Sequence, residues 1–304
     1  MSRYQYQMIE GRRIGRLSTW RGSIPLPAFF PVTTYGDRYP LDKLVQPFLK
    51  RIAPCILVSY HYAQEMKERP ELPLFIDSGG FAGLFEGALI EEHEDHACIR
   101  TRDGEELHPL QVLEFQSEHG DIGATLDFII PPGTDPDEAK RRQRLTIQNA
   151  IYAQKHMSSD SLILYASLQC WDIESARRCA NVYAEAGFEG IAIGGMVPRA
   201  KDVQYIKSIV RAVREEAPEC AIHVFGCGNT ELIPELVQLG ADSFDSSSYV
   251  RGAVPDGAAK DLHTGLYTAI RRLHEVSAAV SGSSEHAAER IPNLELCRQH
   301  HISQ

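Results

Sequence analysis

Residues 162–195, LILYASLQCWDIESARRCANVYAEAGFEGIAIGG, decide the fold. An apolar run at 162–168 is followed by an amphipathic stretch at 172–186 and by a second apolar run at 190–194. Continuous apolar runs of this length are typical of strands that are buried on both faces. Gly187, directly after the amphipathic stretch, is a common residue at a helix end. The segment therefore predicts a strand, a helix and a second strand parallel to the first.

The same alternation recurs along most of the chain. Further apolar runs lie at 28–32, 55–60, 74–77, 124–129, 221–225 and 241–245, and further helix-like stretches lie at 135–157, 202–217 and 230–239. Asp135 and Pro136 are a suitable cap and first-turn residue for the longest of these helices. Eight strands with mostly helical crossovers predict an α/β fold, a TIM-type (β/α)8 barrel, and an open doubly wound sheet is the alternative.

Three segments depart from this rhythm. Residues 4–32 are rich in β-formers and turn residues, which predicts an N-terminal β-hairpin that leads into the first barrel strand. Residues 86–106 are acidic and turn-rich, so we expect an insertion after the third strand. Small and polar residues after Ser277 predict a loosely ordered tail at 278–304, which follows a barrel domain at 1–277.

Composition limits the classes of function. The 304 residues contain 31 Lys and Arg against 41 Asp and Glu, a net charge of −10, which disfavours indiscriminate nucleic-acid binding but leaves a local basic groove open. A hydrophobic content of 43% excludes intrinsic disorder. Apolar runs long enough for a membrane span or a secretion signal are missing, and seven scattered cysteines fit a reducing compartment. We expect a cytoplasmic protein without a membrane partner.

Polar residues and glycines gather where the predicted strands end. In a barrel of this type, the carboxyl ends of the strands form the functional face. The residues at these ends are Asp77, Ser78, Phe81, Asp127, Gln169, Gly194, Gly195, Phe225 and Asp245. Two aromatic rings with glycine-rich turns suit a flat ligand, and the side chains of Asp127 and Gln169 suit its polar edge. Each residue alone also has a structural interpretation, as a helix cap, a turn residue or a core position.

The ordered motifs resemble those of the tRNA-guanine transglycosylase superfamily. Asp-Ser-Gly-Gly-Phe at 77–81 is similar to its Asp-Ser-Gly-Gly-aromatic motif, Ser-Tyr-His at 59–61 to its Thr-Tyr-His motif, and 187–195 to its base-binding strand. Residues 196–198, 223–228 and 244–246 are similar to the archaeal branch. The resemblance extends from about Ile14 to about Tyr249.

This resemblance implies a base exchange, in which guanine leaves a polynucleotide and a 7-deazaguanine base replaces it, without a cofactor. Matched by motif, Asp245 is the nucleophile that attacks C1′, and Asp77 is the general acid and base. The groups implied around the base are Asp127, Gln169, Gly194, Gly195 and Ser78, with Phe81 and Phe225 at the stacking positions. A carboxylate suits a glycosidic carbon that develops positive charge, and a target base must leave its stack to enter such a pocket.

The chain departs from the family in its metal ligands. The family's zinc motif, Cys-x-Cys-x-x-Cys with a distant histidine, is missing from the sequence. Cys297 with His300 and His301 forms one loose group of ligand types, and His93 with His96 and Cys98 forms another. A solvated histidine-rich surface is the simpler interpretation of both groups, so we expect no metal.

The short, zinc-poor and archaeal-like sequence resembles the DNA-acting branch of the superfamily. We therefore expect DNA as the polynucleotide, with tRNA as the alternative. Arg199, Lys201 and Arg251 are candidate phosphate contacts, as is the basic run 140–144, which is equally typical of a solvated helix face. A homodimer, a partner subunit or a non-catalytic binding role stays open. A Schiff-base barrel enzyme is disfavoured because no lysine lies in a predicted strand.

Overall fold

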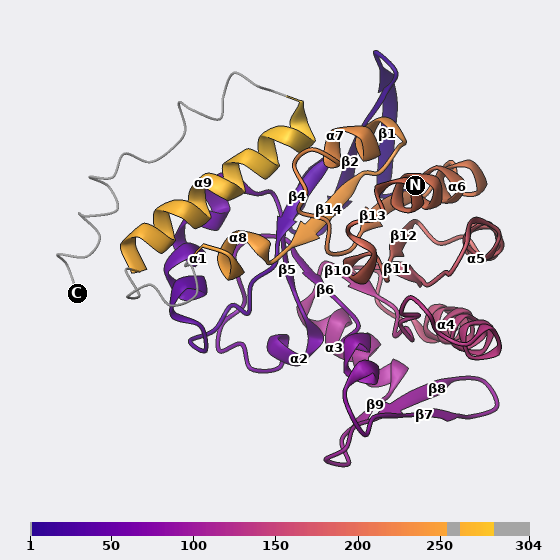
Figure 1. The fold of residues 1–304 in the computed structure, drawn as a ribbon. Coiled ribbons are helices and arrows are strands. Elements are labelled where there is room, and N and C mark those ends of the chain that lie inside the picture. The colour runs from indigo at the N-terminus through magenta and orange to yellow at the C-terminus, as the bar shows by residue number, and fades with distance from the viewer. Residues whose placement is uncertain (1, 254–261, 283–304) are drawn as a thin grey trace.

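Eight parallel strands form a sheet that nearly closes into a barrel (Figure 1). The computed structural model describes residues 2–253 and 262–282. In sheet order the strands are β4 (Ala28–Pro31), β14 (Ser243–Ser246), β13 (Ala221–Val224), β12 (Gly190–Ile193), β11 (Ile163–Leu168), β10 (Ile122–Ala124), β6 (Leu74–Ile76) and β5 (Ile56–Val58). Val32 and Leu57 form a parallel bridge between the edges, and the Thr33 N–H donates to the Leu57 carbonyl at 3.0 Å. The predicted barrel is confirmed, and the open sheet is wrong.

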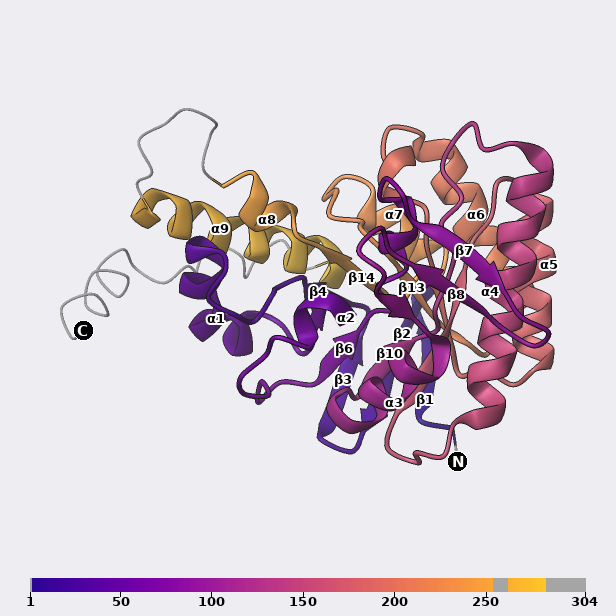
Figure 2. The ribbon, with the colours of Figure 1, turned by 90° about the horizontal axis from the view of Figure 1, so that it is seen from below.

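Helices follow the strands and cover the barrel (Figures 1 and 2). They are α1 (Pro40–Ile52), α2 (Tyr60–Ala63), α3 (Pro109–His119), α4 (Pro136–His156), α5 (Ile173–Glu185), α6 (Val203–Glu216), α7 (Ile233–Gln238), α8 (Ser248–Arg251) and α9 (Leu262–Ser281). The Asp135 carboxylate accepts from the first free backbone N–H groups of α4, as predicted. Asp172 caps α5 in a reciprocal capping box with Ser175. Within the described ranges, none of the helices has the length and apolar character that a membrane span requires.

Strand β10 covers Ile122–Ala124 and not the predicted run 124–129. Beyond β10, side chains take the backbone N–H groups that a neighbouring strand would otherwise bind. The Phe128 N–H donates to Thr146 Oγ1 at 3.0 Å, and the Ile130 N–H donates to Gln169 Oε1 at 3.3 Å. The apolar run therefore leaves the sheet early, because buried polar side chains satisfy its backbone.

Three other predicted boundaries also differ. Strand β14 ends at Ser246, one residue beyond the predicted run 241–245. Helix α7 begins only at Ile233, because the Asn229 side chain and carbonyl cap the preceding turn. Helix α9 continues to Ser281 and so includes the first residues of the predicted tail, whereas residues 283–304 lie outside the described ranges.

The segment before the barrel is a three-stranded antiparallel sheet, one strand more than the predicted hairpin. It consists of β1 (Tyr4–Ile9), β2 (Arg12–Thr19) and β3 (Gly22–Leu26). Its buried Leu17 and Ile24 join Phe30 and Phe75 in the apolar cluster inside the barrel. The sheet therefore contributes to the core of the domain and is not a separate appendage.

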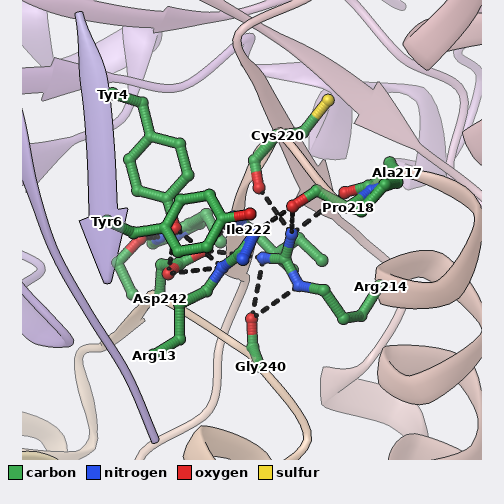
Figure 3. A network of polar contacts seen from close by, with 12 residues as sticks. Tyr4, Tyr6, Arg13, Arg214, Ala217, Pro218, Cys220, Ile222, Gly240 and Asp242 are labelled. Atoms are coloured by element: carbon green, nitrogen blue, oxygen red, sulfur yellow. Dashed lines mark hydrogen bonds and ion pairs between the residues drawn. The ribbon is translucent and has the colours of Figure 1, made fainter. Parts of the chain in front are cut away.

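A buried polar network fastens this sheet to the barrel (Figure 3). The Tyr4 hydroxyl donates to Asp242 Oδ1 at 2.6 Å, and Arg13 Nε donates to the Tyr4 oxygen at 3.0 Å. The other Asp242 oxygen accepts from Arg214 Nη2 at 2.8 Å and from the Ile222 N–H at 2.7 Å. Arg214 also donates to the carbonyls of Ala217, Pro218, Cys220 and Gly240. A buried carboxylate is thus fully paired, as its burial requires.

The predicted insertion after the third strand is a small antiparallel sheet of β7 (Leu89–Glu92), β8 (Ala97–Arg100) and β9 (Glu106–Leu107). It packs on the barrel through a cluster that includes Ile99, Leu126 and Phe128. Glu92 of β7 forms ion pairs with Arg141 and Arg144 of α4. The insertion is therefore fixed to the outside of the barrel beside α4.

Candidate active site

The predicted site residues converge at the carboxyl ends of the barrel strands. Asp77 directly follows β6, Gln169 follows β11, Gly194 follows β12, Phe225 follows β13, and Asp245 lies within β14. Hydrogen bonds link Asp127 to both Ser78 and Gln169. This end of the barrel is the face on which enzymes of this architecture carry their active sites.

Asp77 is a partly buried carboxylate held by backbone donors. Its Oδ1 accepts from the Tyr60 N–H at 3.0 Å and from the Gly79 N–H at 2.9 Å. Burial nevertheless raises the pKa of Asp77 to about 6, although these donors and the Ser59 hydroxyl favour its charged form and Asp245 adds to the increase. A carboxyl group with this pKa can both give and take a proton near neutral pH, as a general acid and base must.

Asp245 is held from one side by two donors to a single oxygen. Its Oδ1 is 3.1 Å from His223 Nε2 and accepts from the Gly226 N–H at 2.9 Å. His223 is fully buried, and its Nδ1 lies 2.9 Å from the Ser243 hydroxyl. Within the part of the chain that the structure describes, Oδ2 of Asp245 makes no hydrogen bond. A fixed carboxylate with a free oxygen is a suitable nucleophile.

Asp127 and Gln169 form a buried pair that is joined to Ser78, the residue after Asp77. Asp127 Oδ1 accepts from the Ser78 hydroxyl at 2.7 Å, and its Oδ2 accepts from Gln169 Nε2 at 2.6 Å. Burial raises the pKa of Asp127, while these two hydrogen bonds oppose the increase. Both side chains are thereby oriented before any ligand binds, which reduces the entropy cost of recognising a polar edge.

The missing side chains of Gly194 and Gly226 let neighbouring residues pack directly against the backbone at these two turns. A Cβ atom at Gly194 would lie 2.1 Å from Gln169 Nε2, so any side chain there would displace the amide. Gly226 has a φ of +70°, and a Cβ atom there would lie 2.2 Å from Cγ2 of Val197. The turn after β12 therefore packs directly against the turn after β13, with the Gln169 amide beneath Gly194.

Phe81 and Phe225 occupy different environments. The Phe81 ring is 59% exposed and packs edge-on against Phe85. The Phe225 ring is half-buried and packs on His223 and Phe75, with centroid separations of 4.8 and 5.9 Å. An exposed aromatic ring at a functional face is available for stacking on a flat ligand.

Two of the candidate phosphate contacts border a cleft beside the site, with a volume of about 750 Å³. Its lining includes Trp171, Val197, Arg199 and Lys201. Arg199 turns inward, because its Nη1 donates to the carbonyls of Ile130 and Gly195 at 3.0 Å each. Lys201 is exposed. Arg199 therefore braces the turn after β12, and the lysine is the better placed of the two for a phosphate.

Of the other basic candidates, one is exposed and the rest are held in ion pairs. Arg251 is exposed at the end of α8. In the basic run 140–144, each lysine and arginine forms an ion pair with an acidic neighbour, mainly Glu92 or Glu138. The run is thus a salt-bridged helix face, and its arginines are already neutralised.

Sequence reasoning missed the role of His223. It lies in a predicted strand, but only the pairing of β13 with β14 places its ring against Asp245. A histidine within an otherwise apolar strand was the visible signal. Val197 was also missed, although it is 61% exposed and covers Gly226 at the edge of the site.

The fold and these motifs define a member of the family described as queuine tRNA-ribosyltransferase. The family model matches residues 9–259, so the chain belongs to this family, and the resemblance found in the sequence is confirmed.

Proteins similar to this chain in sequence are named tRNA-guanine(15) transglycosylase or queuine tRNA-ribosyltransferase. The tRNA-guanine(15) transglycosylase of Methanothermobacter thermautotrophicus is 28% identical over 290 residues, which cover 93% of this chain and 42% of that protein. That of Methanosarcina barkeri is 25% identical over 303 residues, covering 96% and 60%. The queuine tRNA-ribosyltransferase of Caldanaerobacter subterraneus is 28% identical over 273 residues, covering 81% and 72%. The chain thus spans less than two thirds of the length of both archaeal relatives.

Proposed function

We propose that the protein is a guanine transglycosylase that replaces guanine in tRNA with a free 7-deazaguanine base. The observation that carries this proposal is the arrangement of two carboxylates at one end of the barrel, the partly buried Asp77 and the buried Asp245, together with the Asp127–Gln169 pair. The sequence favours DNA as the polynucleotide. The names of the relatives support the tRNA alternative better, so tRNA is the substrate proposed.

The first half of the reaction removes guanine. Asp245 attacks C1′ of the ribose through its free oxygen, and the C1′–N9 bond breaks as the C1′–O bond forms. The departing base takes a proton from Asp77, whose pKa of about 6 leaves a protonated fraction near neutral pH. The product is an ester between the Asp245 side chain and the ribose.

The second half installs the new base in the emptied pocket. The incoming 7-deazaguanine gives its N9 proton to Asp77, which the first half has left ionised. N9 then attacks C1′ and releases Asp245 as a carboxylate. The same acid and base thus serves both directions, so the enzyme returns to its starting protonation state.

The buried pair and the aromatic rings account for base recognition. The Asp127 carboxylate accepts from the N–H groups on the edge of guanine, and the Gln169 amide faces its carbonyl edge. Phe81 supplies an exposed ring for stacking. The cleft that contains Trp171 and Lys201 provides room for a neighbouring nucleotide and its phosphate. A homodimer and a cytoplasmic location stay predictions.

The test is base exchange with identification of the products. Wild-type protein and Asp245→Asn are incubated with a 7-deazaguanine and either bulk tRNA or duplex DNA, and the nucleosides are identified by mass spectrometry. We expect a modified ribonucleoside from wild type alone. A denaturation-resistant protein–tRNA adduct should form with wild type and not with Asp245→Asn. A modified deoxynucleoside would keep the chemistry and replace tRNA with DNA as substrate. Normal exchange by Asp245→Asn would refute the nucleophile assignment.

A further inference from the structure

Three side chains of types that bind metals, none of them among the candidate active-site residues, converge in the insertion after β6. The nitrogens of His93 and His96 and the sulfur of Cys98 supply ligand atoms that all lie within 4.8 Å of one another. In a tetrahedral zinc site, bonds of about 2.0–2.3 Å place the ligand atoms roughly 3.3–3.8 Å apart. Small rotations of the side chains would therefore bring these three atoms onto one ion.

The backbone already fixes the spacing of these residues. His93 and His96 lie in the tight turn between β7 and β8, where the His93 N–H donates to the His96 carbonyl at 2.9 Å. The two rings are stacked, with centroids 4.6 Å apart. Cys98 belongs to β8 and is fully buried. The group therefore combines an exposed histidine, a partly buried histidine and a buried thiol, and is not a uniformly solvated surface.

Neighbouring groups prepare the histidines for a cation. The Asp95 carboxylate lies 2.7 Å from Nδ1 of His96, which leaves Nε2 of that ring for an ion, as in many zinc sites. The ring centroid of His108 lies 4.6 Å from that of His96. Nδ1 of His108 accepts from the Leu110 N–H at 3.1 Å, so its Nε2 is the candidate for a fourth ligand.

We propose that His93, His96 and Cys98 bind a zinc ion. Two imidazole nitrogens and a thiolate are a ligand set that favours zinc over magnesium or calcium, which prefer oxygen. The site differs in position and ligand pattern from the cysteine-rich zinc motif of the family. Zinc binding can be measured without the exchange reaction, so the two proposals are tested separately.

Zinc at this position would stabilise the insertion. The ion would tie the β7–β8 turn to β8 and, with His108 as the fourth ligand, also to the start of α3. A Cβ atom added at Gly83 would lie only 3.3 Å from Cδ1 of Ile99 in β8. Strand β8 therefore packs closely on the turn that follows Phe81. A rigid insertion would in this way hold the exposed Phe81 loop in place.

Metal binding to the full-length chain, prepared without a polyhistidine tag, tests this proposal. The protein is stripped with EDTA, dialysed, and titrated with Zn²⁺ or with Co²⁺, whose thiolate complexes absorb strongly in the near ultraviolet. We expect one tightly bound zinc per chain and a cobalt–thiolate band. Cys98→Ala should lose the band, and both Cys98→Ala and His93→Gln should bind zinc at least about tenfold more weakly.

Matched variants show whether a loss of zinc is specific to these three ligands. Cys179→Ala removes another buried cysteine, and His119→Gln removes another partly exposed histidine; both should bind zinc as wild type does. Because His93 is exposed, His93→Gln should fold normally, which circular dichroism checks. Cys297→Ala should keep the cobalt band. Loss of the band in Cys297→Ala but not in Cys98→Ala, or failure of wild type to bind stoichiometric zinc, would overturn the proposal.

Discussion

Replacing Asp77 with asparagine should abolish exchange and yet stabilise the protein, by an amount that depends on pH. The pKa of Asp77 is raised from 3.8 to about 6, mainly by burial. The folded state therefore binds the proton more tightly than the unfolded chain, and stability falls as pH rises from about 4 to about 6. Asparagine keeps an oxygen for the N–H groups of Tyr60 and Gly79 and carries no charge.

The size of this effect follows from the shift. A difference of about 2.2 pKa units corresponds to about 3 kcal/mol between the two protonation states. The variant should thus gain about 0.6 kcal/mol in the free energy of unfolding at pH 4 and about 3 kcal/mol at pH 8. Urea denaturation of both proteins at several pH values, with exposed Asp160→Asn as the control, measures the difference.

Two results would refute this reasoning. A stability difference that stays constant from pH 4 to pH 8 would show that the pKa of Asp77 is not raised. A variant that still exchanges bases at the wild-type rate would show that Asp77 does not transfer the proton. Loss of that proton transfer should lower the exchange rate about 100-fold or more.

Three further changes have expected outcomes of different kinds. Asp127→Ala should weaken binding of the free base by about 1–3 kcal/mol in calorimetry, and unchanged affinity would exclude Asp127 from the pocket. Gly194→Ala should push Gln169 from Asp127 and raise KM for the base about tenfold, whereas a wild-type KM would show that the turn can yield. Asp242→Ala should lower the free energy of unfolding by about 3–5 kcal/mol, because Arg214 and the Tyr4 hydroxyl lose their buried acceptor. A loss below about 1 kcal/mol in urea denaturation would contradict the assigned role of that ion pair.

The barrel and most of the site were predictable because each depends on local sequence patterns. Buried parallel strands read as continuous apolar runs, and polar residues directly after them, such as Asp77 and Gln169, must lie at the same end of the barrel. The limit of this logic appears at β10. There the apolar run continues, but the side chains of Thr146 and Gln169, distant in sequence, take its backbone N–H groups.

The remaining features depend on strand register or on where a long side chain turns. His223 supports Asp245 only because β13 and β14 pair as they do. Arg199 points to backbone carbonyls, although its position next to a functional turn suggested a phosphate contact. The ligands in the insertion converge only after the β7–β8 turn forms, so their spacing along the chain carried little information.

The link between Tyr4 and Asp242 also constrains the order in which the chain can fold during synthesis. These partners are 238 positions apart, so the first strand to leave the ribosome waits for almost the whole barrel to be made. Until then, the side chains of Leu17 and Ile24 have no barrel core to pack against. A nascent chain that stalls before Arg214 and Asp242 emerge would expose an apolar sheet, a species prone to aggregation. The N-terminal strand is therefore among the last parts of the domain to pack in place.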